Sequence, residues 1–216
     1  MSVEVKICGL RDAAALTAAI DGGARYVGFV FCEDSRRAVM PEHAAELIAQ
    51  VPTSITSVGL FVDPSDDELV RVLRHARLNM IQLHGSETPE RVEAVKKFTG
   101  LPVMKALGIA VLPDIEAARR YESVADMLLF DAKPLPGGPK GGNGIAFDWG
   151  LLEGARFSKP WMLAGGLDAG NIAEAVALSG ARILDVSSGV EDAEKRKSPS
   201  KIKAFLAKAR GLETSY

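Results

Sequence analysis

Apolar strand patterns alternate with amphipathic helix patterns eight times along the chain, and this alternation limits the fold more than any other feature. The predicted strands cover residues 3–10, 25–31, 54–62, 79–83, 102–107, 126–131, 161–164 and 182–186. Each intervening helix returns the chain to the start of the next strand, which gives a parallel sheet. Eight units in 216 residues exceed the roughly five or six strands of an open doubly wound sheet. We therefore expect an α/β protein with a single (β/α)8 barrel domain over residues 1–216.

Prolines and capping residues predict where the helices begin. Four helices are predicted with both ends, at 12–22, 41–49, 114–121 and 171–179. Three more are predicted by their starts alone, at 63–64, 88–89 and 198–199. Pro41, Pro89 and Pro199 suit first helical turns, because the N–H group that proline lacks has no helical partner there. The sixteen residues 132–147 contain five Gly and three Pro. This is too many for a helix or strand, so we expect a long loop that closes over the site as a lid.

The composition argues against several classes of function. The formal net charge is −2, and no cluster of Lys and Arg indicates nucleic acid or an anionic membrane as a partner. No apolar run approaches the roughly 20 residues that cross a bilayer. Glu4 and Lys6 stand where a signal peptide needs its apolar core. We therefore expect a cytoplasmic protein in which Cys8 and Cys32 are free thiols.

The first strand has two unlike faces. Its β-branched residues share one face and its polar residues share the other, which sets Val3, Val5 and Ile7 against Glu4, Lys6 and Cys8. The β-branched face fits under helices, and this leaves the polar face for a barrel interior. Gly9 ends the strand and places Cys8 at its carboxyl end, where barrel enzymes carry their catalytic groups.

Further polar residues and glycines follow the other strands. The candidates are Arg36, Arg37, Gln82, His84, Asp131, Gly165, Gly166 and residues 185–189. Each has an ordinary structural alternative, since a lone cysteine is usually a small buried residue, loop arginines are usually solvated, and a loop histidine is often simply hydrogen-bonded. The glycines after the last two strands, however, lie where barrels often bind phosphate through backbone N–H groups. Asp131 ends an apolar strand, where a carboxylate is costly unless it meets solvent or a ligand.

Neither a metal site nor a nucleotide site is indicated. The three His are scattered and show no metal-ligand spacing. The run GGPKGGNG lacks the Gly-Lys-Ser or Gly-Lys-Thr ending of a nucleotide-binding loop. With no cofactor expected, the thiol of Cys8 and the carboxyl group of Asp131, facing each other across a barrel mouth, suggest proton transfer.

Several short motifs follow one another along the whole chain. They are KICGL at 6–10, GFVF at 28–31, S-x-R at 35–37, VGLFV at 58–62, QLHG at 82–85, MLLFD at 127–131, FDW at 147–149, GGL at 165–167 and DVSSGVE at 185–191. In this order they resemble the phosphoribosylanthranilate isomerase family of tryptophan biosynthesis. The resemblance implies a (β/α)8 barrel and an Amadori rearrangement of a phosphoribosyl aminoaldose to its 1-deoxyribulose aminoketose. It also implies a small phosphosugar substrate and no cofactor, while monomer and homodimer both stay open.

The resemblance implies a role for each matching residue. Cys8 would be the general base for the sugar C2 proton, and Asp131 the general acid that opens the ribose ring. Arg37 would bind the anthranilate carboxylate, and Arg36 stands where the family commonly has proline. Lys6 would favour a partial thiolate on Cys8, and burial would keep Asp131 protonated. Substrate contacts are also implied for Gln82, His84 and Asp185, and phosphate contacts for Gly165, Gly166, Ser187, Ser188 and Gly189.

Three other functions fit part of this pattern. A related sugar isomerase of histidine biosynthesis, or a bifunctional enzyme, would share the fold but use Asp where Cys8 stands. A ribulose-phosphate epimerase would need metal-ligand His and Asp residues at strand ends. A non-catalytic phosphate-binding barrel would keep Gly165, Gly166 and Ser188 but would not need both Cys8 and Asp131.

Overall fold

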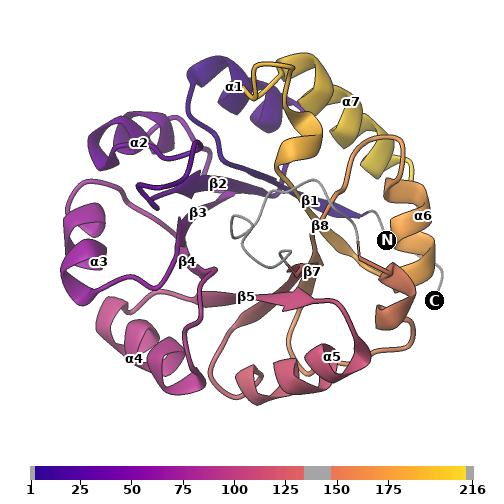
Figure 1. Cartoon of the computed structure of the whole chain (residues 1–216). Coiled ribbons are helices and arrows are strands. Elements are labelled where there is room, and N and C mark those ends of the chain that lie inside the picture. Colours follow the sequence, from indigo (N-terminus) through magenta and orange to yellow (C-terminus); the bar gives the residue numbers. More distant parts are fainter. Residues whose placement is uncertain (1–2, 134–146, 213–216) are drawn as a thin grey trace.

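Eight parallel strands form a closed barrel in the order β1 to β8 (Figure 1). The structure is a computed structural model, and it describes residues 3–133 and 147–212. The strands are β1 Glu4–Cys8, β2 Tyr26–Val30, β3 Thr56–Phe61, β4 Met80–Leu83, β5 Val103–Ile109, β6 Met127–Ala132, β7 Trp161–Leu163 and β8 Ile183–Val186. β1 pairs with both β2 and β8, which closes the barrel and confirms the predicted fold.

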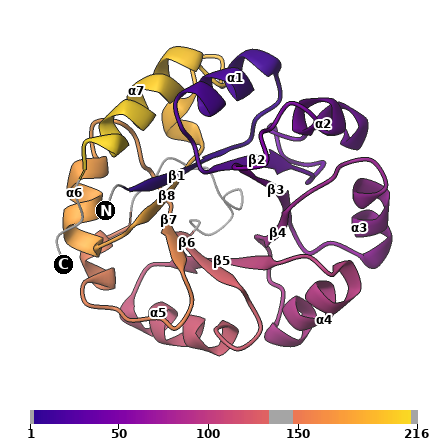
Figure 2. The same cartoon turned by 180° about the vertical axis from the view of Figure 1, so that it is seen from behind.

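Helices surround the barrel as an outer ring, seen from both ends in Figures 1 and 2. They are α1 Ala13–Asp21, α2 Pro41–Ile48, α3 Asp66–Leu73, α4 Pro89–Thr99, α5 Leu112–Ala118, α6 Ile172–Ser179 and α7 Pro199–Arg210. Three short 3-10 helices are η1 Arg119–Tyr121, η2 Trp149–Leu152 and η3 Ser188–Val190. No helix in the described ranges has the length and hydropathy that a membrane span requires.

One predicted helix start differs from the structure. The helix expected to open at 63–64 begins instead after Ser65, which accepts the N–H of Glu68 in a capping box. Asp63 has a φ of +48°, so it belongs to the preceding turn. Between β6 and β7, the described residues contain the four-residue η2, and the sequence predicts no helix there.

The buried residues form an outer and an inner core. The outer core joins strand residues such as Val5 and Ile7 to the helices, for example through Leu16 of α1 and Phe205 of α7. The inner core fills the barrel with strand residues, chiefly Tyr26, Val58, Met80, Met104, Met127, Leu129 and Met162. Cys8 lies in a separate inner cluster with Val30 and Leu60. The two predicted faces of the first strand are therefore confirmed, with Cys8 on the inside.

Candidate functional site

Cys8 lies at the carboxyl end of β1, beside Gly28 of β2. A Cβ atom on Gly28 would lie 3.1 Å from Cys8 Sγ and 3.2 Å from Lys6 Cε, so the glycine leaves room for both side chains. Burial raises the pKa of the Cys8 thiol, and the nearby Lys6 ammonium, which lowers it, offsets only part of the effect. The pKa of Cys8 therefore lies above its ordinary value, so burial favours the thiol where the sequence predicts a partial thiolate.

Lys6 and Asp185 form an ion pair inside the barrel. They are partners in the pairing of β1 with β8, and Lys6 Nζ lies 2.8 Å from Asp185 Oδ1. Burial by itself lowers the pKa of Lys6, but Asp185 and Cys8 together raise it above its ordinary value. Lys6 therefore stays charged, and its charge is balanced by Asp185 before any substrate binds.

Asp131 occupies the carboxyl end of β6. Its Oδ1 accepts the backbone N–H of Ala132 at 2.8 Å, and its Oδ2 lies 3.3 Å from His84 Nε2. Gly165, which has a φ of +85°, packs directly against this group. A Cβ atom there would lie 2.7 Å from Ala132 N and 3.2 Å from Asp131 Oδ1. The turn after β7 therefore needs glycine to leave space for the Asp131 carboxyl group.

Gln82 and His84 extend the contacts of Asp131 to β4. Gln82 is fully buried, and its Nε2 lies 3.1 Å from His84 Nδ1. The motif QLHG thus supplies an amide and an imidazole that form a chain of contacts ending at the Asp131 carboxyl group. The structure brings these three predicted residues together as neighbours.

Arg37 is held by Glu191 of the segment after β8. Arg37 Nε and Nη2 lie 2.6 Å and 3.2 Å from the two Glu191 oxygens, and Lys197 Nζ lies 2.9 Å from Oε1. Burial would raise the pKa of Glu191, but Arg37 and Lys197 hold it below its ordinary value. Arg36 is half exposed and reaches Glu191 only at 3.5 Å. The structure thus separates a buried, oriented arginine from an exposed one.

The turns after β7 and β8 touch each other. A Cβ atom on Gly189 would overlap the Leu167 carbonyl oxygen, so only glycine fits at this contact. Gly166 has a φ of +65°, and its carbonyl accepts the side-chain N–H of Asn171 at 2.8 Å. Ser187 Oγ donates to the Cys8 carbonyl oxygen at 3.2 Å. The predicted phosphate residues therefore form two adjoining turns, with Ser188 at the start of η3.

The sequence indicates no role for Glu191 or Lys197, and it indicates Lys6 only as a neighbour of Cys8. A lysine facing a barrel interior needs a buried partner, which was the available signal for the Lys6–Asp185 pair. Lys197 follows a run of charged residues and gives no signal of its burial. The predicted lid, residues 132–147, lies mainly outside the described residues. Among the residues the structure does describe, no group of three or more His, Cys, Asp or Glu side chains could hold a metal ion.

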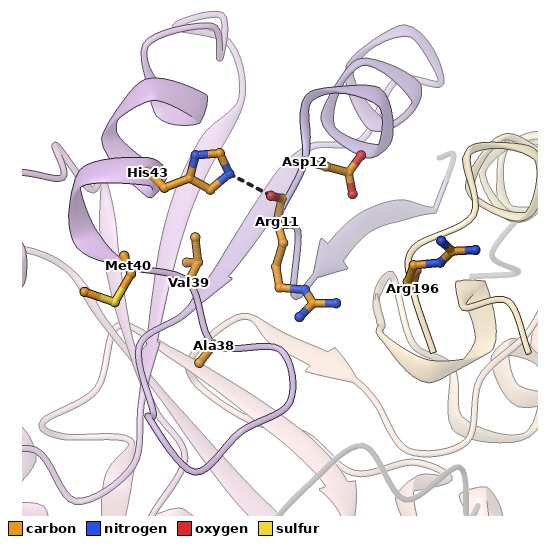
Figure 3. Close-up of a pocket in the computed structure, with 7 residues that line it drawn as sticks. All are labelled: Arg11, Asp12, Ala38, Val39, Met40, His43 and Arg196. Atoms are coloured by element: carbon orange, nitrogen blue, oxygen red, sulfur yellow. Dashed lines mark hydrogen bonds between the residues drawn. The ribbon is translucent and has the colours of Figure 1, made fainter. Parts of the chain in front are cut away.

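An open pocket of about 500 Å³ lies beside this site, between the starts of α1 and α2 and the segment before α7 (Figure 3). None of the predicted site residues lines it. His43 Nε2 lies 2.9 Å from the Arg11 carbonyl oxygen across the pocket, and Arg11 Nη1 donates to the Arg36 carbonyl at 2.7 Å. Arg11 therefore holds the loop that carries Arg36 and Arg37 from outside the barrel.

Comparison with known proteins gives a consistent result. A family model described as N-(5'phosphoribosyl)anthranilate (PRA) isomerase matches residues 5–208. The N-(5'-phosphoribosyl)anthranilate isomerase of Paracoccus denitrificans is 57% identical over 214 residues, which are 97% of this chain and 98% of that protein. The crystal structure of phosphoribosyl anthranilate isomerase from Thermotoga maritima is 33% identical with a TM-score of 0.85, covering 97% of this chain and 100% of that one. A structure of such an isomerase with reduced 1-(o-carboxyphenylamino)-1-deoxyribulose 5-phosphate is 32% identical with a TM-score of 0.83, at the same coverage.

Proposed function

Because this chain belongs to the phosphoribosylanthranilate isomerase family, we propose that it carries out the family's reaction with Cys8 as general base and Asp131 as general acid. The reaction converts N-(5'-phosphoribosyl)anthranilate into 1-(2-carboxyphenylamino)-1-deoxyribulose 5-phosphate in tryptophan biosynthesis. The observation that best supports these roles is that Cys8 and Asp131 lie at the carboxyl ends of two strands of one barrel, Cys8 as the last residue of β1 and Asp131 as the residue before the last one of β6. Groups at that end of a barrel converge on one ligand.

Asp131 would act first. A proton on the furanose ring oxygen allows the bond between that oxygen and C1 to break, while the anthranilate nitrogen supplies electrons to form an iminium ion. The carboxyl group of Asp131 is almost buried, and the N–H of Ala132 donates to its Oδ1. That donor is in place to stabilise the carboxylate left behind after proton transfer.

Cys8 would act second. The iminium ion acidifies the neighbouring C2–H, so a base can remove that proton and leave an enamine that becomes the ketone product. A thiol whose pKa is raised gives a stronger base once it ionises, and Lys6 is placed to stabilise the thiolate. The thiol proton would pass to solvent before the C2 proton is removed, and the positive charge of the iminium ion would favour that ionisation.

The ends of the substrate would be held by the neighbouring groups. Arg37 would bind the anthranilate carboxylate through the guanidinium N–H groups that do not contact Glu191. His84 and Asp185 would contact the ribose portion, and the fully buried Gln82 would support His84. The two adjoining turns would bind the phosphate, through residues Gly165, Gly166, Ser187, Ser188 and Gly189. The bound product analogue in the related structure belongs to the same class of ligand.

Kinetics of two variants test the proposal. Cys8→Ala and Asp131→Asn should each lower kcat by roughly 10²–10⁴-fold with little change in KM, because each removes a proton-transfer group and leaves the binding contacts. The assay follows the loss of anthranilate-type fluorescence when the substrate is generated in situ. A kcat close to that of the unaltered protein in either variant would remove that residue from the mechanism.

A further inference from the structure

Gln82 has a fully buried amide whose two ends have unlike surroundings. Its Nε2 lies 3.1 Å from His84 Nδ1, whereas its Oε1 is buried with no hydrogen-bond partner among the described residues. A buried acceptor without a partner costs free energy, and an apolar side chain of the same size would avoid that cost. The presence of an amide here therefore calls for a reason other than stability.

His84 joins this amide to Asp131. Its Nε2 lies 3.3 Å from Asp131 Oδ2. When Gln82 donates to His84 Nδ1, that nitrogen carries the lone pair, so the proton of the neutral ring sits on Nε2. The N–H of His84 then lies on the nitrogen that is 3.3 Å from Asp131 Oδ2, while Ala132 N donates to Oδ1. Both carboxyl oxygens of Asp131 thus lie near an N–H group.

We propose that Gln82 is a positioning residue that holds His84 in its Nε2–H tautomer, so that His84 stabilises the carboxylate formed on Asp131 during ring opening. This inference rests on the proposed role of Asp131 as general acid. As Asp131 gives up its proton, negative charge grows on its carboxyl group, and a donor already in place stabilises that charge more than it stabilises the neutral acid. The other tautomer of His84 would direct a lone pair at the new carboxylate.

Other ionisable side chains near the barrel mouth have partners of their own. On β5 the partner of Asp131 in the sheet is Gly108, and β7 contains only Trp161, Met162 and Leu163. Lys133, two positions on, pairs instead with Asp114 at 2.9 Å. Lys105 of β5 pairs with Glu87 at 2.7 Å, and Lys6 and Lys197 pair with Asp185 and Glu191. The contact with His84 is therefore the one through which Gln82 can act on Asp131.

The first test reads the tautomer directly. Methionine is similar in length to glutamine but cannot donate to His84 Nδ1, so Gln82→Met removes the proposed contact. Nitrogen-15 NMR of the imidazole rings shows which nitrogen carries the proton, and His43 and His75 are internal controls among the three His of the chain. We expect the Nε2–H tautomer for His84 in the unaltered protein and a mixture of tautomers in the variant. An Nδ1–H tautomer in the unaltered protein, or no change in the variant, would overturn the proposal.

The second test separates this role from a structural one. Gln82→Met should lower kcat by about 10-fold, the effect of one hydrogen bond to a charged group, with KM nearly unchanged. Its melting temperature should stay equal or rise, because the unpaired oxygen is gone. In a His84→Ala background the same substitution should leave kcat unchanged, since the contact no longer exists. An equal loss of kcat in that background, or an effect on KM alone, would contradict the proposal.

Asp131→Asn is measured alongside these variants. If it keeps its kcat, the proposed role of Asp131 fails and with it the catalytic consequence drawn here. The NMR result would still establish whether Gln82 sets the tautomer of His84, so the two failures can be told apart.

Discussion

Charged side chains around the barrel mouth are paired before a substrate arrives. Lys6 Nζ lies 2.8 Å from Asp185, and Arg37 Nε lies 2.6 Å from Glu191. A buried charge without a partner costs several kcal/mol, so each member of a pair keeps the other ionised. Groups held in this way need little rearrangement when charge develops in the reaction.

The ionisation of Cys8 provides a prediction at the residue scale. Because burial raises the pKa of this thiol above its ordinary value of 9.0, its thiolate should form only at a higher pH. The measurement is the ultraviolet absorbance of thiolate across an alkaline titration, taken as the difference between the unaltered protein and Cys8→Ser. Cys32 is present in both proteins and cancels. A thiolate signal from Cys8 near neutral pH would show that Lys6 outweighs burial after all.

The two adjacent arginines give a second prediction. Contacts with Glu191 use one N–H each from Nε and Nη2 of Arg37, which leaves the Nη1–Nη2 end of the guanidinium for a second carboxylate. Arg37→Lys keeps the charge beside Glu191 but loses this forked geometry, so KM should rise about 10-fold.

Arg36→Lys is the matched control, and it should leave KM nearly unchanged because Arg36 is half exposed. Steady-state kinetics on both variants decide between the two residues. If Arg36→Lys gives the larger rise in KM, the carboxylate contact belongs to Arg36.

At the scale of helices and strands, the sequence predicts the position of every strand because Gly, Pro and capping residues bound each one. The predicted helix start at 63–64 is wrong for a physical reason, since Asp63 before Pro64 and Ser65 before Asp66 are both good helix starts. The structure chooses Ser65, whose hydroxyl and Glu68 complete a capping box. The short η2 could not be predicted, because four residues are too few to show a helical period.

The candidate site was predictable to the extent that it lies at strand ends. Parallel strands bring their carboxyl ends to one face, so Cys8, His84 and Asp131 could be grouped from their positions in sequence alone. The partners of Arg37 could not, because Glu191 and Lys197 lie on a loop whose path depends on tertiary packing. Whether the grouped residues bind and react as proposed stays a prediction.

The turns after β7 and β8 allow a prediction about phosphate. Ser188→Asp places a fixed negative charge where the phosphate would bind, so KM should rise strongly, by about 100-fold or more, through like-charge repulsion. Ser188→Asn, which has a similar size and no charge, is the control and should change KM much less. Inorganic phosphate should inhibit the unaltered protein and Ser188→Asn competitively. It should inhibit Ser188→Asp more weakly, because the added negative charge repels it. An unaltered KM in Ser188→Asp would place the phosphate elsewhere.

At the scale of the whole molecule, the first and last strands and helices meet on one side of the barrel. β1 pairs with β8, and α1 packs on α7 next to it (Figure 1). Glu191 adds a polar connection near the same place, because it links Arg37 after β2 to Lys197 just before α7. This single carboxylate thus ties the first quarter of the barrel to its last element.

Stability against acid should depend on Glu191. Its pKa in the folded protein lies below the ordinary value, so the unfolded chain binds this proton more readily. The stabilisation is therefore fully present above the ordinary glutamate pKa of 4.5 and is lost as the pH falls through the lower folded value. Urea unfolding measured from pH 7 down to about 3 should show this loss in the unaltered protein.

Glu191→Gln should remove the effect. Arg37 and Lys197 would then be buried without a counter-charge, which should lower the free energy of unfolding at neutral pH by roughly 3 kcal/mol. The same variant should lose less stability on acidification, because the carboxylate that titrates is gone. Glu194→Gln, an exposed position in the same loop, is the control and should keep both the neutral stability and the acid dependence. Equal acid dependence in Glu191→Gln and the unaltered protein would mean that other carboxylates control acid unfolding.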